Sequence, residues 1–436
     1  MKTVIRPETE MKDSGIEYVG AIPNDWDLVR LRAYFGERKN KNKDGNETNL
    51  LSLSYGRIIR KNIDKTDGLL PASFNTYNIV EKNDIIIRPT DLQNDKRSLR
   101  TGLVTEHGII TSAYIDLMPI GNVDSRFVHY LLHSYDILKV FYNMGSGVRQ
   151  GLNYSEFSKL KVPMPLLSEQ QAIADYLDET CSKIDEIIAE AKASIDEYKE
   201  LKQSVIFEAV TKGLDKNIEM KDSGVEWIGE IPNDAKLVPL KYLVSKTITD
   251  GTHQTPDYES SENGSPFLSS KDISSGKIDF SNIKYITKKL HEELYKNVAP
   301  QINDILLAKN GTTGVAALVE TDMVFDIYVT LALIRPDITK VLPKYLLHDI
   351  NCYVVKRQFD EHLLGIGVPN LHLSVIRNTK VIIHNKNQQK EISDFLDKRT
   401  AEIDSLITEK ESLINDLEAY KKSLIYEVVT GKRRVV

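Results

Sequence analysis

The stretch EMKDSGIEYVGAIPND at residues 10–25 returns almost unchanged as EMKDSGVEWIGEIPND at residues 219–234. Twelve of the sixteen positions are identical, and three of the other four exchange Ile with Val or one aromatic residue with another. A segment of about 140 residues with little sequence similarity follows each copy. Repetition on this scale indicates two copies of one structural unit in the chain.

A second shared stretch closes each unit. EQQAIADYLDETCSKIDEII (169–188) matches NQQKEISDFLDKRTAEIDSLI (387–407), and SVIFEAVTKG (204–213) matches SLIYEVVTGK (423–432), at an offset of 219 residues. Both stretches lack Pro and reach a Gly only near their ends, as long helices do. Gly213 and Gly431 are the expected C-terminal stops, so we expect helices over 169–212 and 387–430.

Apolar residues in these two stretches recur at alternating spacings of four and three. A 3.5-residue period over several heptads is typical of a coiled-coil seam, so we predict that the two helices pair with each other, antiparallel. Two separate amphipathic helices, each on its own core, remain the alternative. The predicted seam residues are Leu177, Ile184, Ile188, Ile195, Leu396, Ile403, Ile407, Ile414 and Leu417.

The two intervening segments contain short β-branched runs separated by turn residues, followed by helical pieces. NDIIIRPTD (83–91) and NDILLAKNG (303–311) occupy equivalent places, each an Asn-Asp turn before a strand-like run. The predicted fold class is α+β, with two α/β domains joined by the paired helices as a pseudo-two-fold internal repeat. The predicted boundaries are 1–167 for the first domain with its copy of the phrase, 168–213 for the first long helix, 214–385 for the second phrase and domain, and 386–436 for the second long helix.

The repeated phrase is expected to join a helix end to the neighbouring domain. The first helix runs into the second phrase with almost no linker, so by symmetry the second helix should end beside the first phrase. This places the two chain termini close together. Tyr18 and Trp227 are expected to pack within these joints, and Pro23 and Pro232 to fix the exit of the chain.

Composition and charge limit the classes of protein. The hydrophobic share of 41% and charged share of 28% are those of a globular protein, and no apolar run approaches the roughly 20 residues of a membrane span. Two cysteines, and an N-terminus without a signal-peptide pattern, predict a reducing, cytoplasmic setting. The net charge of −6 is uneven: residues 26–167 hold 20 basic against 15 acidic side chains, whereas residues 168–212 hold 5 against 11.

This layout resembles the specificity (S, HsdS-type) subunits of type I restriction-modification enzymes. The resemblance covers nearly the whole chain and is carried by the repeated phrase, DGTHQTP (250–256), the NDIL-type turn and the shared opening of each long helix. It implies a DNA-specificity subunit with two target-recognition domains, each reading one half of a bipartite asymmetric site. It also implies that the helices set the spacer between the two half-sites and bind two methyltransferase subunits. Restriction subunits would join the complex through these methyltransferase subunits. The first domain departs from the pattern because it lacks a DGTHQTP counterpart.

Candidate DNA-binding residues are polar side chains in clusters on turns at matching places in both domains. Arg suits guanine and Asn or Gln suits adenine, while Lys, Ser and Thr suit phosphate. Taken singly, each is more often a solvated surface residue. The candidates are Arg57, Arg60, Arg88, Thr90, Arg97, Arg100, Ser146, Arg149 and Gln150 in the first domain, and Thr252, His253, Gln254, Lys271, Lys309, Asn310, Thr312, Thr313, Asn370 and His372 in the second.

No catalytic or metal-binding motif is recognisable in the sequence. A P-loop and an amino-methyltransferase motif are missing, HEELY (291–295) lacks the second His of a zinc protease, and EYK (197–199) falls on the predicted coiled coil. We therefore expect that the chain is not an enzyme. The resemblance assigns S-adenosylmethionine, ATP and Mg to partner subunits. The alternatives are a stand-alone DNA-binding protein, which the charge of −6 disfavours, and a coiled-coil scaffold that joins proteins.

Overall fold

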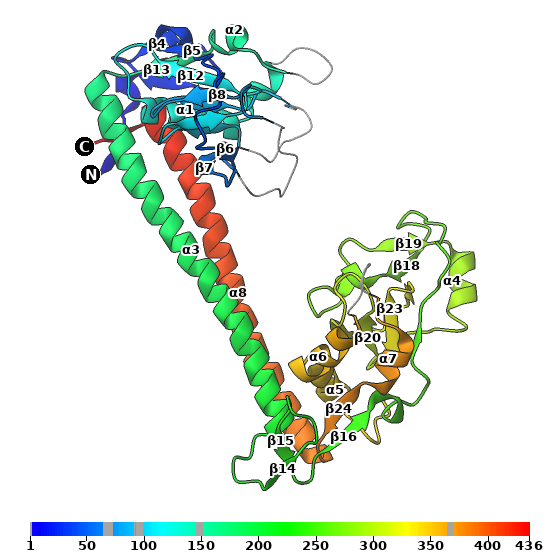
Figure 1. The fold of residues 1–436 in the computed structure, drawn as a ribbon. Helices are drawn as coiled ribbons and strands as arrows, with labels where there is room; N and C mark the ends of the chain where they lie inside the picture. Colours follow the sequence, from blue (N-terminus) through cyan, green and yellow to red (C-terminus); the bar gives the residue numbers. More distant parts are fainter. Residues whose placement is uncertain (1, 64–72, 91, 93–98, 145–150, 364–369) are drawn as a thin grey trace. The chain divides into compact units, whose positions relative to one another are not determined.

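The computed structural model describes residues 2–63, 73–90, 92, 99–144, 151–363 and 370–436, and Figure 1 shows its elements. Two compact units divide the chain: the first comprises residues 1–191 and 412–436, and the second comprises residues 192–411. Each unit therefore contains one α+β domain and parts of both long helices, α3 (Leu167–Lys212) and α8 (Lys386–Val429). None of the helices among the described residues is both long and apolar enough to cross a membrane.

The first unit is built on an antiparallel sheet in the order β10-β9-β12-β5, with α1 (Ser125–Ile137) packed on it. Short antiparallel pairs surround this sheet. The sheet strands are β5 (Phe35–Glu37), β9 (Ile85–Ile87), β10 (Thr101–Leu103) and β12 (Ile115–Pro119); the pairs are β1 (Thr3–Ile5) with β25 (Arg433–Val435), β2 (Met11–Asp13) with β3 (Ala21–Pro23), β4 (Asp27–Arg30) with β13 (Lys161–Met164), β6 (Leu51–Ser54) with β7 (Arg57–Arg60), and β8 (Asn78–Val80) with β11 (Gly108–Ile110).

The second unit repeats this plan with a sheet in the order β17-β23-β20-β21. Read from the opposite edge, β21, β20, β23 and β17 correspond to β10, β9, β12 and β5. The elements are β14 (Met220–Asp222), β15 (Glu230–Pro232), β16 (Lys236–Pro239), β17 (Thr249–Asp250), β18 (Ser265–Leu268), β19 (Lys284–Ile286), α4 (Lys288–Leu294), β20 (Ile305–Ala308), β21 (Ala316–Leu318), β22 (Asp326–Ile327), β23 (Leu331–Ile334), α5 (Pro343–Ile350), α6 (Tyr353–His362), α7 (Leu373–Asn378) and β24 (Lys380–Ile383).

The equivalent Asn-Asp turns have the same conformation. Asn83 and Asn303 both adopt a positive φ, of 77° and 75°, which Asn tolerates better than most residues. The following Asp84 and Asp304 each accept the backbone N–H three residues earlier, at 2.8 Å, and each pairs with a partly buried Arg, Arg38 and Arg335 respectively. The repeated Asn-Asp is thus explained by turn geometry at the entry to the central strand.

The long helices pair within each unit, as predicted. In the first unit Lys421 of α8 contacts Asp185 of α3 at 2.6 Å, and in the second Lys202 of α3 contacts Asp404 of α8 at 2.6 Å. The start of α3 thus lies beside the end of α8 in one unit, and the end of α3 beside the start of α8 in the other, so the helices are antiparallel. Of the nine predicted seam residues, seven are buried, and Ile407 and Leu417 are half-buried.

The second long helix ends at Val429, next to the predicted stop at Gly431. Gly431 takes a left-handed φ of +74°, and the rest of the segment 386–436 then forms β25. β25 pairs antiparallel with β1, with Thr3 opposite Val435. The expected proximity of the two termini is therefore confirmed (Figure 1).

Each copy of the repeated phrase lies against the end of a long helix. In the first unit the Tyr426 hydroxyl donates to the Val19 carbonyl at 3.1 Å, and Lys432 Nζ donates to the same oxygen at 2.6 Å. In the second unit Ile228 and Ile231 share a buried cluster with Val210 of α3. The phrase is repeated because the same joint is built twice.

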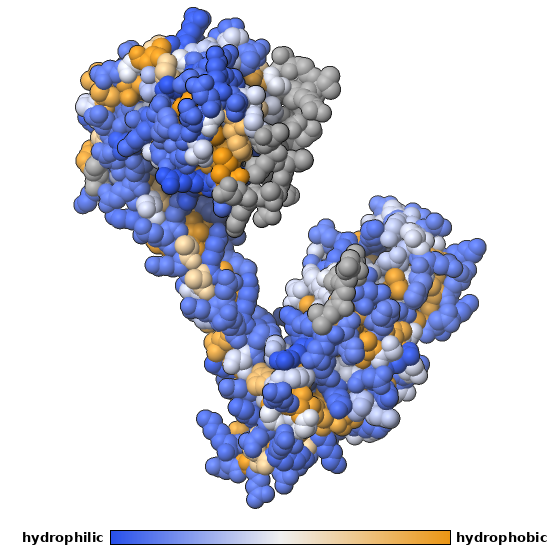
Figure 2. Space-filling model, viewed as in Figure 1, coloured by the Kyte–Doolittle hydropathy of each residue, from blue (hydrophilic) through white to orange (hydrophobic). Residues whose placement is uncertain are grey.

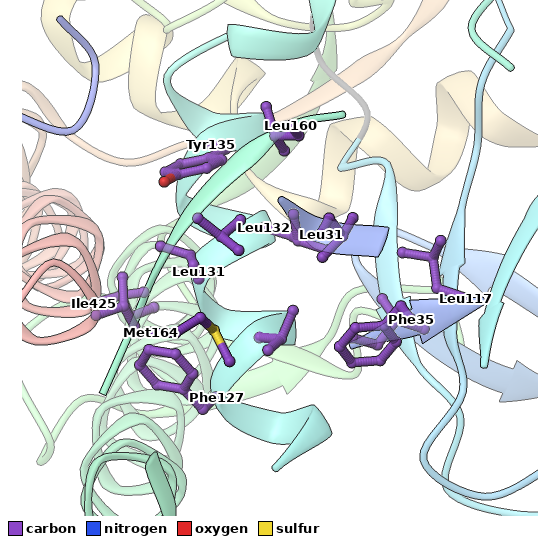
Figure 3. Close-up of a cluster of buried hydrophobic side chains, with 14 of the residues drawn as sticks. Leu31, Phe35, Leu117, Phe127, Leu131, Leu132, Tyr135, Leu160, Met164 and Ile425 are labelled. Atoms are coloured by element: carbon purple, nitrogen blue, oxygen red, sulfur yellow. The ribbon is translucent and has the colours of Figure 1, made fainter. Parts of the chain in front are cut away.

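The core of the first unit includes side chains from the distant end of the sequence. Figure 3 shows Ile425 of α8 among Phe127 and Leu131 of α1 and Met164 of β13, and all four residues are buried. Tyr18 of the phrase packs edge-on against Tyr135 at a centroid distance of 5.1 Å. The domain and the helix pair therefore share one hydrophobic core within this unit.

We predict that Gly431→Ala destabilises the chain more than Gly213→Ala. Both glycines follow a long helix with positive φ, of +74° and +71°, so Ala costs about 1–2 kcal/mol at either. A Cβ on Gly431 would also lie 2.4 Å from Cγ and Cδ of Pro23, whereas one on Gly213 meets nothing closer than 3.8 Å. Overpacking should add about 1–3 kcal/mol at Gly431 alone. Urea unfolding of the two variants measures the difference, and equal losses would contradict the close joint.

Candidate nucleic-acid interface

The candidates in the second unit converge around one buried ion pair. Lys309, directly after β20, contacts Asp250 at the end of β17, with the two side chains only 7% and 11% exposed. The Lys309 backbone N–H donates to the Thr330 carbonyl, and its carbonyl accepts from Leu371 N at 2.7 Å. The pair therefore joins the DGTHQTP loop, the loop after β20 and the chain before α7.

The remaining candidates of this unit surround that pair. Thr312 Oγ1 donates to the Ser270 carbonyl at 3.4 Å, which brings the loop after β20 beside Lys271. Gly251 lies so close to β22 that a Cβ would stand 1.8 Å from the Ile327 carbonyl oxygen, so only Gly fits there. His253, Gln254, Lys271, Thr312, Asn370 and His372 are exposed, and Thr252, Asn310 and Thr313 are half-buried. The Lys309–Asp250 pair and the Thr312–Ser270 hydrogen bond bring the loops that carry these residues together.

The burial of Lys309 contradicts its selection from the sequence as a DNA-binding candidate. Its ammonium group faces Asp250 inside the domain and is 7% exposed, so it holds loops together instead of meeting DNA. Asp250 offsets the free-energy cost of burying the Lys309 charge, because an isolated charge in the domain interior is unfavourable. Sequence reasoning could not distinguish this lysine from an exposed one on the same loop.

In the first unit, Arg57 and Arg60 are both on β7 and are 73% and 71% exposed. Arg57 contacts Asp185 of α3 at 2.8 Å, and Arg60 contacts Glu106. The Arg60 hydrogen bond lowers the pKa of the Glu106 carboxyl. These exposed ion pairs are weak, so a phosphate or base could replace the carboxylate.

The burial of Arg100 likewise contradicts its selection as a DNA-binding candidate. It is fully buried, its guanidinium donates to the Thr90 and Arg88 carbonyls, and it stacks 5.3 Å from the Tyr142 ring. Arg100 therefore holds the chain that leaves β9, on which Arg88 is half-buried and Thr90 is exposed. Arg97, Ser146, Arg149 and Gln150 lie outside the described residues.

Equivalent backbone links position the loops in both units. Leu152 N donates to the Pro89 carbonyl at 2.9 Å in the first, and Leu371 N donates to the Lys309 carbonyl at 2.7 Å in the second. In each unit the chain before the last strand thus crosses the end of the central strand. The two domains share this scaffold and differ in the side chains that it presents.

Each domain is fixed to a long helix by what we call the helix clasp, Gln170 with Asp178 on α3 and Gln389 with Asp397 on α8. The Gln170 side-chain oxygen accepts from the backbone of Asp124, the N-cap of α1, at 3.0 Å, and the Gln389 oxygen accepts from Leu342, the N-cap of α5, at 2.9 Å. Both amide groups are buried and also donate to carbonyls just before their helix, those of Pro165 and His384.

The carboxylates of the clasp hold the next turn of the same short helices. Asp178 accepts from Tyr130 at 2.8 Å and Arg126 at 3.0 Å, and Asp397 accepts from His348 and Lys344, both at 2.8 Å. The His348 contact, with that of Lys344, lowers the pKa of Asp397 to about 2. The matching stretches at 169–178 and 388–397 are therefore similar because they dock equivalent helices.

Within the described ranges, no three His, Cys, Asp or Glu side chains gather closely enough to hold a metal ion. In each unit, the sheet and its hydrophobic core support loops that carry polar side chains. This arrangement suits recognition of a ligand surface.

Comparisons with known proteins agree with this geometry. The family model described as the type I restriction modification DNA specificity domain matches residues 36–197 and again residues 254–416. The chain belongs to this family. The two matches each cover most of one domain and its helix, so the specificity family accounts for the repeat.

Individual relatives extend the similarity along the chain. The MjaVIII specificity subunit of Methanocaldococcus jannaschii is 25% identical over 95% of this chain and 94% of its own length. The EcoBI specificity subunit of Escherichia coli is 23% identical over 71% of this chain and 66% of its own. Two solved structures share the fold. A chain from a study of assembly and conformational transition in the type I R-M system has a TM-score of 0.68 and 15% identity, over 94% of this chain and 99% of its own. The HsdS subunit from Thermoanaerobacter tengcongensis has a TM-score of 0.50 and 14% identity, over 94% of this chain and 98% of its own.

Sequence reasoning missed two residues of the candidate sites, Asp250 in the second unit and Tyr55 in the first. Asp250 is the partner that removes Lys309 from the surface. Tyr55, between β6 and β7, is 80% exposed and lies two residues before Arg57 in the sequence. A two-residue Tyr-Gly between strand-like runs was the available signal for a tight hairpin.

We predict that Lys309→Met destabilises the chain whereas Lys271→Met does not. Removal of Lys309 leaves Asp250 buried without its partner, which costs about 3 kcal/mol for pairs of this kind. Lys271 is 57% exposed, and its loss should change stability by less than about 0.5 kcal/mol. Urea unfolding tests both. Unchanged stability of Lys309→Met, together with weakened DNA binding, would restore Lys309 as a DNA contact.

Proposed function

We propose that the chain is the DNA-specificity subunit of a type I restriction-modification complex. Each domain reads one half of a bipartite asymmetric DNA site, and the paired helices set the spacer. The observation that carries this proposal is the double family match, over two domains with the same sheet order and different side chains on equivalent loops. Two different readers on one chain suit a target with two different halves.

The partner surface is proposed on the side of the helix pair away from the domains. Asp178 and Asp185 directly follow seam residues Leu177 and Ile184, and both contact the first domain. The residues that directly precede seam residues lie on the other side, and in an antiparallel pair those of both helices share it. Lys202 and Lys421 continue the seam register, seven residues after Ile195 and Ile414, so the residues before them belong to this side as well. In the first unit this side carries Ile187, Leu413 and Tyr420, which are all exposed.

The second unit carries an equivalent apolar patch, formed by Leu201 of α3 and Leu406 of α8, both exposed. Leu406 is the counterpart of Ile187 and Tyr420 that of Leu201, at the repeat offset of 219. Figure 2 shows hydrophobic residues on the surface of the long helices, which is otherwise mainly hydrophilic. Exposed apolar patches favour protein binding, and two equivalent patches suit two copies of one partner, the methyltransferase subunit.

Catalysis is proposed to belong to the partners. Methylation of adenine would use S-adenosylmethionine on the methyltransferase subunits, and cleavage would use ATP and Mg on restriction subunits that join through them. With a net charge of −6 the chain is poorly suited to hold DNA alone, which favours an assembly over a stand-alone binder.

The test of the proposed function is co-expression of the chain with a methyltransferase subunit of its own host, followed by purification and mapping of methylated adenines with and without this chain. A stable complex and one split, asymmetric motif that depends on the chain are expected. A chain that stays alone and leaves methylation unchanged would overturn the proposal in favour of a scaffold.

Substitutions in one domain should change one half of the motif. We predict that Gln254→Ala relaxes base preference in one half and Arg60→Ala in the other, each by about 5-fold to 150-fold if a bidentate base contact is lost. Methylation of a randomised duplex library by the purified complex measures this, with the exposed Lys199→Ala on α3 as control. Changes confined to the same half for both variants would contradict separate readers.

Substitutions in the apolar patches should change the stoichiometry. We predict that Leu406→Glu or Ile187→Glu each reduces the complex from two methyltransferase subunits to one, and that the double variant binds none. Ser405→Glu adds the same charge to an adjacent exposed position outside the patch and should retain both. Mass measurement of the purified complexes gives the ratio. Two bound subunits in the double variant would exclude this surface.

A further inference from the structure

The β6–β7 hairpin ends in a turn of unusual composition. Ser54 pairs with Arg57, so the loop consists of Tyr55 and Gly56 alone, and their φ angles are +45° and +80°. Two positive φ angles are typical of a type I′ turn, for which Asn-Gly and Gly-Gly are the favoured sequences. A tyrosine at the first position is a strained choice, since bulky residues rarely adopt positive φ.

Nothing inside the described chain explains this tyrosine. Its side chain is 80% exposed, the largest exposed fraction of any large hydrophobic residue in the described ranges. Across the same ranges its ring packs against no other aromatic ring and its hydroxyl forms no hydrogen bond. Strained residues that lack an internal role are found at functional sites.

The hairpin that presents Tyr55 is firmly placed. A Cβ on Gly56 would lie 3.2 Å from the Leu99 side chain and 3.7 Å from His133 of α1, so the turn is seated on the domain. Arg57 contacts Asp185 of α3, which Lys421 of α8 also contacts. Behind the turn, Leu53 and Ile58 close over Gly102 of β10. The Tyr55 ring therefore projects from a rigid support.

The surroundings of Tyr55 favour nucleic acid over protein. Arg57 and Arg60 on the same hairpin are exposed, and each pairs with a surface carboxylate that a phosphate or base can replace. A two-stranded β-ribbon fits the major groove of DNA. The apolar patches proposed for the methyltransferase lie on the opposite side of the helix pair from Asp185, the residue that Arg57 contacts.

We propose that Tyr55 is a base-contacting specificity residue, carried into the groove of one half-site by the β6–β7 hairpin, with Arg57 and Arg60 of the same hairpin beside it. This inference rests on the proposed DNA-specificity function and adds a residue to it. The second domain has no equivalent: after β18 the chain continues as SSKDISSG (269–276), with a 3-10 helix at Ser270–Ile273. The aromatic contact therefore contributes to the difference between the two half-sites.

The test uses Tyr55→Asn in the chain assembled with its methyltransferase. Asn tolerates positive φ, so the thermal stability of the variant should equal or exceed that of the wild type. Loss of the apolar contact between the ring and a base edge, such as a thymine methyl group, should weaken binding to the target duplex about tenfold and relax the preference at one base pair of one half-site. Tyr55→Phe retains the ring and should bind nearly as the wild type. Tyr242→Asn, at another exposed tyrosine, is the matched control.

The outcomes are distinct. Unchanged affinity of Tyr55→Asn, or equal loss on target and random duplexes, would overturn the base contact. Loss of the methyltransferase subunit from the purified variant would also overturn it and identify Tyr55 as a protein contact. If the wild-type complex itself failed to distinguish target from random duplex, the proposed function would fail first, and the inference with it.

Discussion

The helix clasp is the interaction on which the rest of the architecture depends. A buried amide and a carboxylate two turns later, Gln170 with Asp178 and Gln389 with Asp397, take hold of the N-terminus and first turns of α1 and α5. A buried Gln must have its polar atoms satisfied, so its partners fix both position and direction. Each domain is thereby placed on its helix in the same way, whatever its loops contain.

Above that common base, buried charges serve the scaffold. Lys309 with Asp250, Arg100 with the Thr90 carbonyl, and Arg335 with Asp304 hold strand ends and loops in place. Because buried charged groups need partners, they constrain loop geometry more strictly than apolar packing does. The exposed polar residues beside them are then free to differ between the two domains, and this separates stability from recognition.

The sides of the helix pair are also divided between two tasks. Positions after the seam carry carboxylates that meet the domains, and positions before it carry exposed apolar residues that the chain itself leaves uncovered. The same division occurs in both units, because the repeat reproduces the heptad register together with the clasp. The proposed function assigns the two equivalent surfaces to two copies of one partner and the two different loop surfaces to an asymmetric DNA site.

The sequence by itself determined the repeat, the pairing of the long helices, the joint at each helix end and the family, because these depend on periodicity and on residues repeated at a fixed offset. Only the tertiary structure decided which polar residues are available at the surface. Arg100 and Lys309 are buried while Arg60 and Lys271 are exposed, although all four are in similar loop or strand-end sequences. Burial depends on neighbours from distant segments, such as Asp250 beside Lys309, and local sequence does not encode those neighbours.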